Sequence, residues 1–202
     1  GRVAPALAAL EQLPPDVLRV VQALLHSLPP RDDTVHFLKR LILEAPEASQ
    51  AIAGNLIALR YALTVFSWSR FLSESVIRHP QWLLDIAIAH DLHRGFLAED
   101  YEESLRLTLG DATPRPVDLA LFRRRQLLRI VLRDVLRYAD LSETAEDLSN
   151  LADAILNVTW RAVRRDLTRE RGVNSHADGT PAEFSVIALG KLGGRELNYS
   201  SD

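Results

Sequence analysis

The sequence predicts a mostly α-helical protein that ends in a short strand and a glycine-rich turn. Three observations support this fold class. Through residues 1–110, apolar side chains return every three or four positions between prolines, which is the spacing of one face of an α-helix. Two longer helical patterns follow a linker with two prolines at residues 111–116. From Phe184 a short apolar run leads into a segment rich in glycine, which is typical of a buried strand and a turn.

The composition limits the classes of function. The chain has 202 residues, a net charge of −3 and no cysteine. This charge argues against a general nucleic-acid binder, and no apolar run approaches the roughly 18 residues that span a bilayer. We therefore expect no nucleic-acid partner and no membrane contact. The absence of cysteine excludes disulfides and thiolate metal sites and fits a cytoplasmic protein. The chain also has no methionine, so we expect that a native start is missing.

Prolines divide the first part of the chain into helices. Proline ends a helix or occupies its first turn, and it occurs here as Pro14-Pro15, Pro29-Pro30, Pro46 and Pro80. Gly54 interrupts one apolar series without removing its period, so we expect a single helical pattern across it. The expected helical segments cover residues 17–25, 35–42, 51–73 and 80–97.

Two long helices are expected after the linker. The first covers residues 117–139, and the second begins at Asp140 and continues for up to about thirty residues. Asp140 followed three residues later by Glu143 is an arrangement like a capping box, which marks a helix N-terminus. Gly172 predicts the end of that helix, and the polar residues 174–181 predict a loop or hairpin tip.

Four arginines are spaced four apart on the first long helix and would form one ridge. Such a ridge could bind a phosphate or an acidic partner. Acidic side chains of the following helix could equally neutralise it, and both interpretations stay open. The arginines are Arg125, Arg129, Arg133 and Arg137, and the candidate acidic partners are Glu143, Glu146, Asp147 and Asp153.

The last thirteen residues are the strongest candidate for a site of chemistry. Gly193 and Gly194 permit a backbone to approach a ligand closely, because no side chain blocks it. The carboxylate of Asp202 comes eight residues later, and at the start of a second strand it could hold a divalent cation. Leu192 stands where a P-loop requires Ser or Thr, so the segment is not a P-loop. A turn without chemistry is the alternative interpretation.

The run GKLGGRELNYSSD, Gly190 to Asp202, closely resembles the signature of glutamine synthetase adenylyltransferase/adenylyl-removing enzymes. The segment FRRRQLLRIVLRD, Phe122 to Asp134, resembles the arginine-rich helix that precedes that signature, and residues 69–80 are similar to the family's N-terminal helical part. The resemblance implies a multi-helix bundle that leads into the first strand and glycine turn of an α/β polymerase-beta-type nucleotidyltransferase domain. The implied division is an N-terminal helical region at 1–112, two long helices and a loop at 113–182, and the start of the nucleotidyltransferase core at 183–202.

The resemblance also implies a function. The signature follows roughly 180 helical residues. This placement resembles that of the first of the family's two copies of the nucleotidyltransferase domain. That copy removes AMP from a tyrosine of glutamine synthetase by phosphorolysis, which yields ADP and restores the tyrosine. The second copy performs the forward transfer from ATP. We expect the 202-residue chain to be inactive alone, because further carboxylates of the site would lie beyond it.

The resemblance implies the roles of individual residues and the partners. Asp202 matches the first metal-binding aspartate and would be both a catalytic residue and a ligand of Mg²⁺. The partners would be glutamine synthetase, a PII-type signal protein, ATP or ADP, and phosphate. The alternative is a non-catalytic helical module that binds glutamine synthetase or a PII-type regulator. The residues implied to bind nucleotide or phosphate are Gly193, Gly194, Lys191, Arg195 and Ser201.

Overall fold

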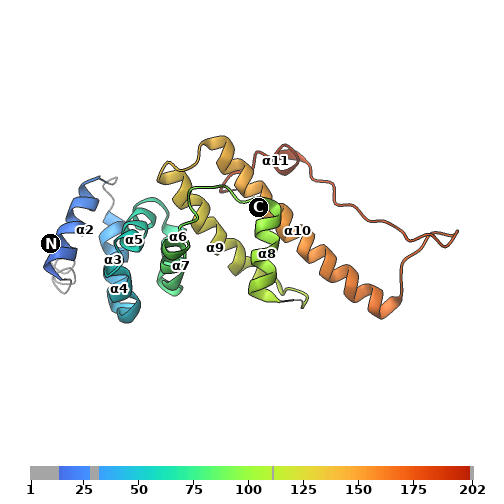
Figure 1. Ribbon diagram of the computed structural model, residues 1–202, viewed down its shortest axis with the longest axis horizontal. Helices are drawn as coiled ribbons and strands as arrows, with labels where there is room; N and C mark the ends of the chain where they lie inside the picture. The colour runs from blue at the N-terminus through green and yellow to red at the C-terminus, as the bar shows by residue number, and fades with distance from the viewer. Residues whose placement is uncertain (1–13, 28–31, 111, 201–202) are drawn as a thin grey trace. The chain divides into compact units, whose positions relative to one another are not determined.

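The structure, a computed structural model, describes residues 14–27, 32–110 and 112–200. Within these ranges the chain is mostly α-helical, as predicted (Figure 1). Their only β pairing is an isolated antiparallel bridge between Ser175 and Pro181. The chain divides into two compact units: residues up to 93 together with 131–138, and residues 94–130 together with 139 onward.

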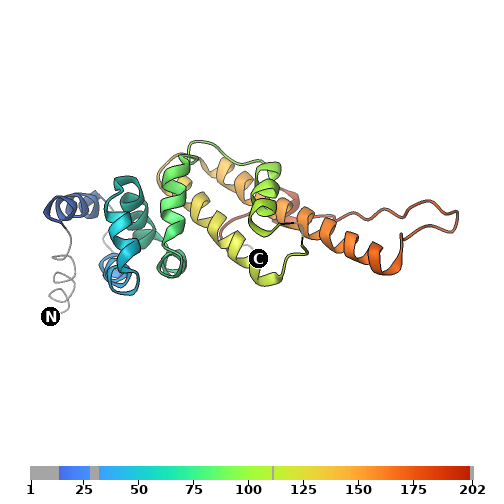
Figure 2. The ribbon, with the colours of Figure 1, turned by 60° about the horizontal axis from the view of Figure 1, so that its bottom comes forward.

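The first unit is built around one central helix, α5 (Leu56–Trp68). Every side chain from Tyr61 to Ser67 is buried, and α5 packs against each of the other helices described before residue 93. Figure 2 shows the ribbon of these helices from a second side. The Phe66 ring stacks on Phe37 with their centroids 5.7 Å apart, and the hydroxyls of Thr34 and Ser67 share a buried hydrogen bond of 3.0 Å. These helices are α2 (Pro15–Ser27), α3 (Asp32–Glu44), α4 (Pro46–Ala53), α5 (Leu56–Trp68), α6 (Arg70–Arg78) and α7 (Gln81–Ala89).

The prediction of one helical pattern over residues 51–73 was wrong, because two polar caps divide it. The Asn55 side chain accepts hydrogen bonds from the backbone amides of Ile57 and Ala58, and so begins α5. The Ser69 hydroxyl accepts one from the amide of Leu72 and begins α6. Each cap satisfies amides that a continuous helix would have paired internally.

The expected helix over residues 80–97 is also shorter than predicted. α7 ends at Ala89, and His90 then adopts a left-handed conformation with a φ of 51°. Leu92 is nevertheless buried, so this position belongs to the core without being helical. Periodicity alone does not distinguish these two situations.

Among the described residues, no single helix combines the length and apolar character needed to cross a membrane. The pair α4 and α5 meets that test only when taken together, and the two helices are bent by 115° at the break between them.

The second unit contains α8 (Ala98–Leu109), the larger part of α9 (Pro116–Val135), α10 (Leu141–Arg171) and α11 (Gly190–Gly193). α8 packs along α10. Tyr101 and Leu105 of α8 are fully buried, as is Ala154 of α10. The first long helix was predicted to reach residue 139, but α9 ends at Val135, and Arg137 beyond it has a φ of 64°.

The predicted ends of the second long helix are confirmed. The Asp140 side chain accepts a 2.8 Å hydrogen bond from the amide of Glu143, and the Glu143 side chain accepts a 2.9 Å bond from the amide of Asp140. This reciprocal pair is a capping box with Asp at the N-cap. At the other end Gly172 has a φ of 81°, a left-handed conformation that glycine adopts without steric cost.

The predicted strand after Phe184 is not formed within the described residues. The chain leaves α10, turns near the Ser175–Pro181 bridge and runs back along α10 to α11 (Figure 1). No described segment pairs with residues 184–189, and a strand needs a neighbour for its backbone donors and acceptors. Ile187 and Leu189 are 81% and 83% exposed, so the apolar run that suggested a buried strand is not buried here.

Candidate functional site

The glycine-rich segment forms a single helical turn, α11. Gly190 has a φ of 60°, and the amides of Gly194 and Glu196 donate to the carbonyls of Gly190 (2.9 Å) and Lys191 (2.7 Å). A Cβ atom at Gly193 would lie 2.5 Å from the carbonyl oxygen of Ala188. Glycine is therefore required at position 193 by the chain's own backbone.

Arg195, directly after this turn, attaches it to α10. Its Nε donates to both carboxylate oxygens of Glu146 at 2.9 Å, and its Nη1 donates to Asp153 at 2.9 Å. Its Nη2 donates to the side-chain oxygen of Asn150 and lies 2.8 Å from Glu146. All three guanidinium nitrogens thus have acceptors on one face of α10.

This ion pair changes the pKa values of its members. Hydrogen bonding to Glu146, and then to Asp153, raises the pKa of Arg195, while burial opposes the change. The same bond from Arg195 lowers the pKa of Glu146 below its usual value, again against desolvation. A carboxyl whose pKa is lower in the folded state stabilises the fold at pH values above its unfolded pKa. This stabilisation is lost as the pH falls through the folded pKa.

We therefore expect the Glu146 carboxyl to titrate below the value of about 4.3 of an unperturbed glutamate. In an Arg195→Ala chain the midpoint should return toward that value, because the cationic donor is gone. NMR titration of the carboxyl carbon measures both midpoints. Equal midpoints in the two chains would contradict the pairing.

A buried polar network lies behind the Arg195 contacts. The side-chain amide of Asn150 donates to the backbone carbonyl of Phe96 at 2.8 Å, and the Phe96 amide donates to Asp147 at 2.8 Å. Asp147 also accepts from the Tyr101 hydroxyl at 3.0 Å and lies 3.7 Å from the guanidinium of Arg129. The Arg129 guanidinium lies over the Phe96 ring, 3.4 Å from its centroid. The surface that receives Arg195 is thus fixed by buried contacts.

The arginine ridge contributes to this interior. Arg129 is buried beside Asp147 and donates to the carbonyl of Arg94 at 2.6 Å. Arg133 is buried in the first unit, where its Nε donates to the carbonyl of Leu92 at 3.0 Å. For Arg129, which faces a buried carboxylate, the structure favours the neutralised, structural interpretation over a phosphate site. Arg133 is buried and donates to a backbone carbonyl, which also favours a structural role. Arg137 is exposed.

The structure places some of the implied site residues and leaves others outside its range. Gly193 and Gly194 lie in and after α11, and Lys191 is exposed on it. Ser201 and Asp202 lie outside the described residues. Among the described residues no group of three or more His, Asp or Glu side chains could hold a metal ion together. The described residues therefore show no coordination geometry for Mg²⁺.

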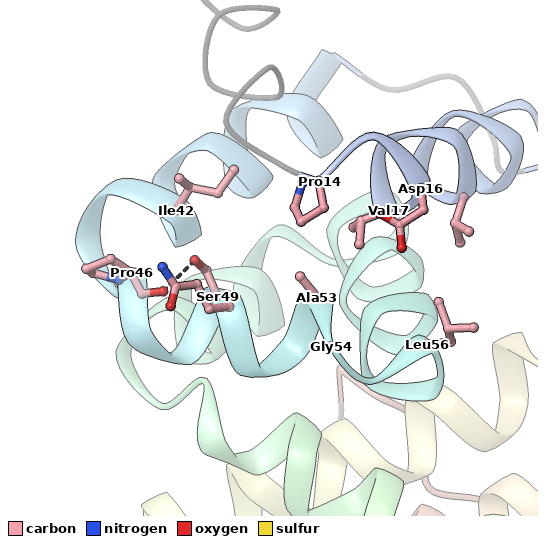
Figure 3. A pocket seen from close by; sticks show the side chains of 11 residues that line it. Pro14, Asp16, Val17, Ile42, Pro46, Ser49, Ala53, Gly54 and Leu56 are labelled. Atoms are coloured by element: carbon pink, nitrogen blue, oxygen red, sulfur yellow. Dashed lines mark hydrogen bonds between the residues drawn. The ribbon is translucent and has the colours of Figure 1, made fainter.

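A separate hollow lies in the first unit, between α2, α3, α4 and α5 (Figure 3). Its lining is mainly apolar, with Val17 and Ile42 among its residues, and Asp16 is the one ionisable side chain among the described residues that line it. The Ser49 hydroxyl donates to the carbonyl of Pro46 at 2.8 Å, so its hydrogen is already bonded within the same helix. This lining lacks the paired acid and base, or nucleophile and base, that catalysis requires.

Sequence reasoning missed the acceptors of Arg195. Glu146 and Asp153 were considered only as partners of the arginine ridge. They are seven residues apart on α10, which is two helical turns and places them on one face. That spacing indicates an acidic patch, but nothing in the sequence indicates that a residue more than forty positions later would meet it.

Comparisons with known proteins agree with the glycine-turn signature. A family model described as glutamate-ammonia ligase adenylyltransferase matches residues 59–202. Three relatives have the name bifunctional glutamine synthetase adenylyltransferase/adenylyl-removing enzyme. The protein of Nitrosococcus oceani is 36% identical over 148 residues, which are 71% of this chain and 15% of that protein. That of Thioalkalivibrio sulfidiphilus is 33% identical over 190 residues, 88% of this chain and 20% of that protein.

The third relative, from Shewanella loihica, is 34% identical over 143 residues, 69% of this chain and 15% of that protein. The chain thus spans between 15% and 20% of the length of these three relatives. No solved structure matches the chain.

Proposed function

Since the chain belongs to the glutamate-ammonia ligase adenylyltransferase family, we propose that it is part of a longer enzyme that regulates glutamine synthetase. Within that enzyme we assign it to the half that removes AMP. One observation carries this proposal: the GKLGGRELNYSSD signature lies inside the matched residues and follows a long, mostly helical region. The signature would begin a polymerase-beta-type nucleotidyltransferase domain.

The proposed reaction is phosphorolysis. An oxygen of inorganic phosphate attacks the phosphorus of the AMP group, and the bond between that phosphorus and the tyrosine oxygen breaks. The tyrosine oxygen takes a proton, and the AMP group leaves joined to phosphate as ADP. Such transfers depend mainly on positioning and on neutralising charge at the phosphates, because the protein itself has little covalent chemistry to perform.

The residues of the glycine turn are proposed to contact this substrate. Gly193 and Gly194 give a backbone surface without side chains, and the exposed Lys191 supplies a positive charge. Ser201 is a further candidate for a phosphate contact. Asp202 is proposed as a ligand of Mg²⁺, an ion that would neutralise charge on phosphate oxygens when bound.

The helical region is proposed to present a surface to large protein partners. These are glutamine synthetase and a PII-type signal protein, and the setting would be the cytoplasm. Exposed apolar side chains support a binding role, since Phe184, Ile187 and Leu189 all lie on the surface of the described chain. This also supports the second candidate function, a helical interaction module without chemistry.

The test compares two proteins with adenylylated glutamine synthetase, Mg²⁺ and phosphate. We expect no release of ADP by the 202-residue chain and phosphate-dependent release by a protein extended by about 150 residues, roughly one further domain. Omission of phosphate is the matched control. ADP release by the short chain would contradict the proposed inactivity. If the extended protein binds glutamine synthetase but releases no ADP, the interaction module is the better account.

A further inference from the structure

We propose that Arg195 is a positioning residue that holds the glycine turn against α10, and that it does not bind phosphate. The resemblance implied a phosphate contact for this arginine. The expected effect of Arg195 on catalysis rests on the proposed function, whereas its expected effect on the structure of the glycine turn does not.

The geometry supports attachment to the protein itself. The Nε, Nη1 and Nη2 atoms of Arg195 all have acceptors on α10, at Glu146, Asp153 and Asn150. A guanidinium binds phosphate through a fork of two such nitrogens, so the present contacts occupy the groups that would receive the ligand.

The local charge leads to the same conclusion. Two carboxylates surround one guanidinium, so this cluster carries a net charge of −1 when all three groups are ionised. A phosphate brought to Arg195 would also approach Glu146 and Asp153, which would repel it. Lys191, four residues earlier, is exposed and forms no ion pair within the part of the chain that the structure describes, so it is the better candidate to attract phosphate.

One of the three acceptors, Asn150, is held in place by a contact that does not involve Arg195. The side-chain amide of Asn150 donates to the carbonyl of Phe96, and this contact orients its oxygen toward Arg195. Arg195 itself has a φ of 56°, an unusual conformation for a residue other than glycine, which implies that its surroundings fix it. Because the next amide, of Glu196, closes the turn onto Lys191, the position of the Arg195 side chain sets the orientation of the turn.

The first test uses the 202-residue chain and needs no enzymatic activity. We expect Arg195→Ala to increase amide hydrogen exchange at Gly194–Glu196 by roughly tenfold, because the turn opens more often once it is detached from α10. The double variant Glu146→Gln/Asp153→Asn should give a similar increase. Glu170→Gln, an exposed carboxylate on the same helix, is the matched control and should leave the exchange unchanged. Unchanged exchange in both test variants would overturn the proposal.

The second test uses the longer enzyme. A positioning role predicts that Arg195→Ala and the double variant both lower kcat by about 10- to 100-fold, since a small misplacement of reacting groups is costly, with KM for phosphate nearly unchanged. A phosphate ligand predicts the opposite: a raised KM for phosphate in Arg195→Ala, and an unchanged or lowered one in the double variant. Faster exchange together with an enzyme that never releases ADP would reject the proposed function and leave the positioning role standing.

Discussion

Replacing Asp147 by alanine is expected to lower the free energy of unfolding by about 3–5 kcal/mol. The Asp147 side chain is completely buried and contacts the amide of Phe96, the hydroxyl of Tyr101 and the guanidinium of Arg129. Its loss would remove the carboxylate that faces the buried Arg129 and the oxygen that accepts from the Phe96 amide and the Tyr101 hydroxyl. Removal of the buried carboxylate opposite a buried guanidinium is the main cost.

Urea denaturation followed by circular dichroism measures this effect. Asp147→Asn should cost less than Asp147→Ala, because an amide oxygen can still accept from Phe96 and Tyr101 although the charge facing Arg129 is gone. Glu170→Ala is the matched control and should stay within about 0.5 kcal/mol of the unchanged chain, since Glu170 is exposed on the same helix. A loss below about 1 kcal/mol in Asp147→Ala would show that the network is not a stabilising centre.

Gly193→Ala is expected to open the glycine turn. The added Cβ would lie 2.5 Å from the carbonyl oxygen of Ala188, so the backbone on one side must move. In the 202-residue chain, amide exchange at Gly194–Glu196 should rise at least about tenfold. In the longer enzyme the rate of ADP release should fall by about a hundredfold, because a displacement of about 1 Å near a reacting group has an effect of this size.

Gly194→Ala provides the matched control for the structure of the turn. A Cβ at Gly194 would meet its nearest atom, the Gly190 carbonyl oxygen, at 3.4 Å, and Gly194 has a φ of −83° that alanine adopts readily. Exchange of the neighbouring amides in this chain should therefore stay within about threefold of the unchanged chain. Equal effects of the two substitutions on exchange would contradict the steric argument for Gly193.

Much of the helical architecture could be predicted from local signals. Prolines mark the starts of α2, α4 and α9, and the apolar period gives each helix its buried face. The predictions of a capping box at Asp140 and Glu143 and of a helix end at Gly172 were correct, because each feature depends only on neighbouring residues. The family was correctly identified from the terminal signature.

The breaks within helices could not be predicted in this way. Asn55 and Ser69 lie inside a continuous apolar pattern, and whether such a side chain caps a new helix or simply points to solvent depends on tertiary packing. The prediction of a strand after Phe184 was wrong for a related reason. An apolar run favours a strand only if another segment supplies its hydrogen bonds, and no described segment does so.

The local geometry of the glycine turn could be anticipated only in part from the sequence. The signature indicates that position 193 requires glycine. The structure adds the reason, because the backbone at Ala188 occupies the space that a Cβ atom would need. The partners of Arg195 lie 49 and 42 residues earlier, at Glu146 and Asp153, and a contact over such a separation leaves no periodic trace in the sequence. The assignment of Asp202 and Ser201 remains a prediction, because both lie outside the described residues.

The central claim is the proposal that this chain belongs to the half of the enzyme that removes AMP. Its most direct test is the product formed from adenylylated glutamine synthetase by the longer enzyme, measured with and without inorganic phosphate. We predict ADP, formed only when phosphate is present, and a rate at least about a hundredfold lower in the Asp202→Asn variant. ADP release that is independent of phosphate, or that is unchanged in Asp202→Asn, would contradict the account.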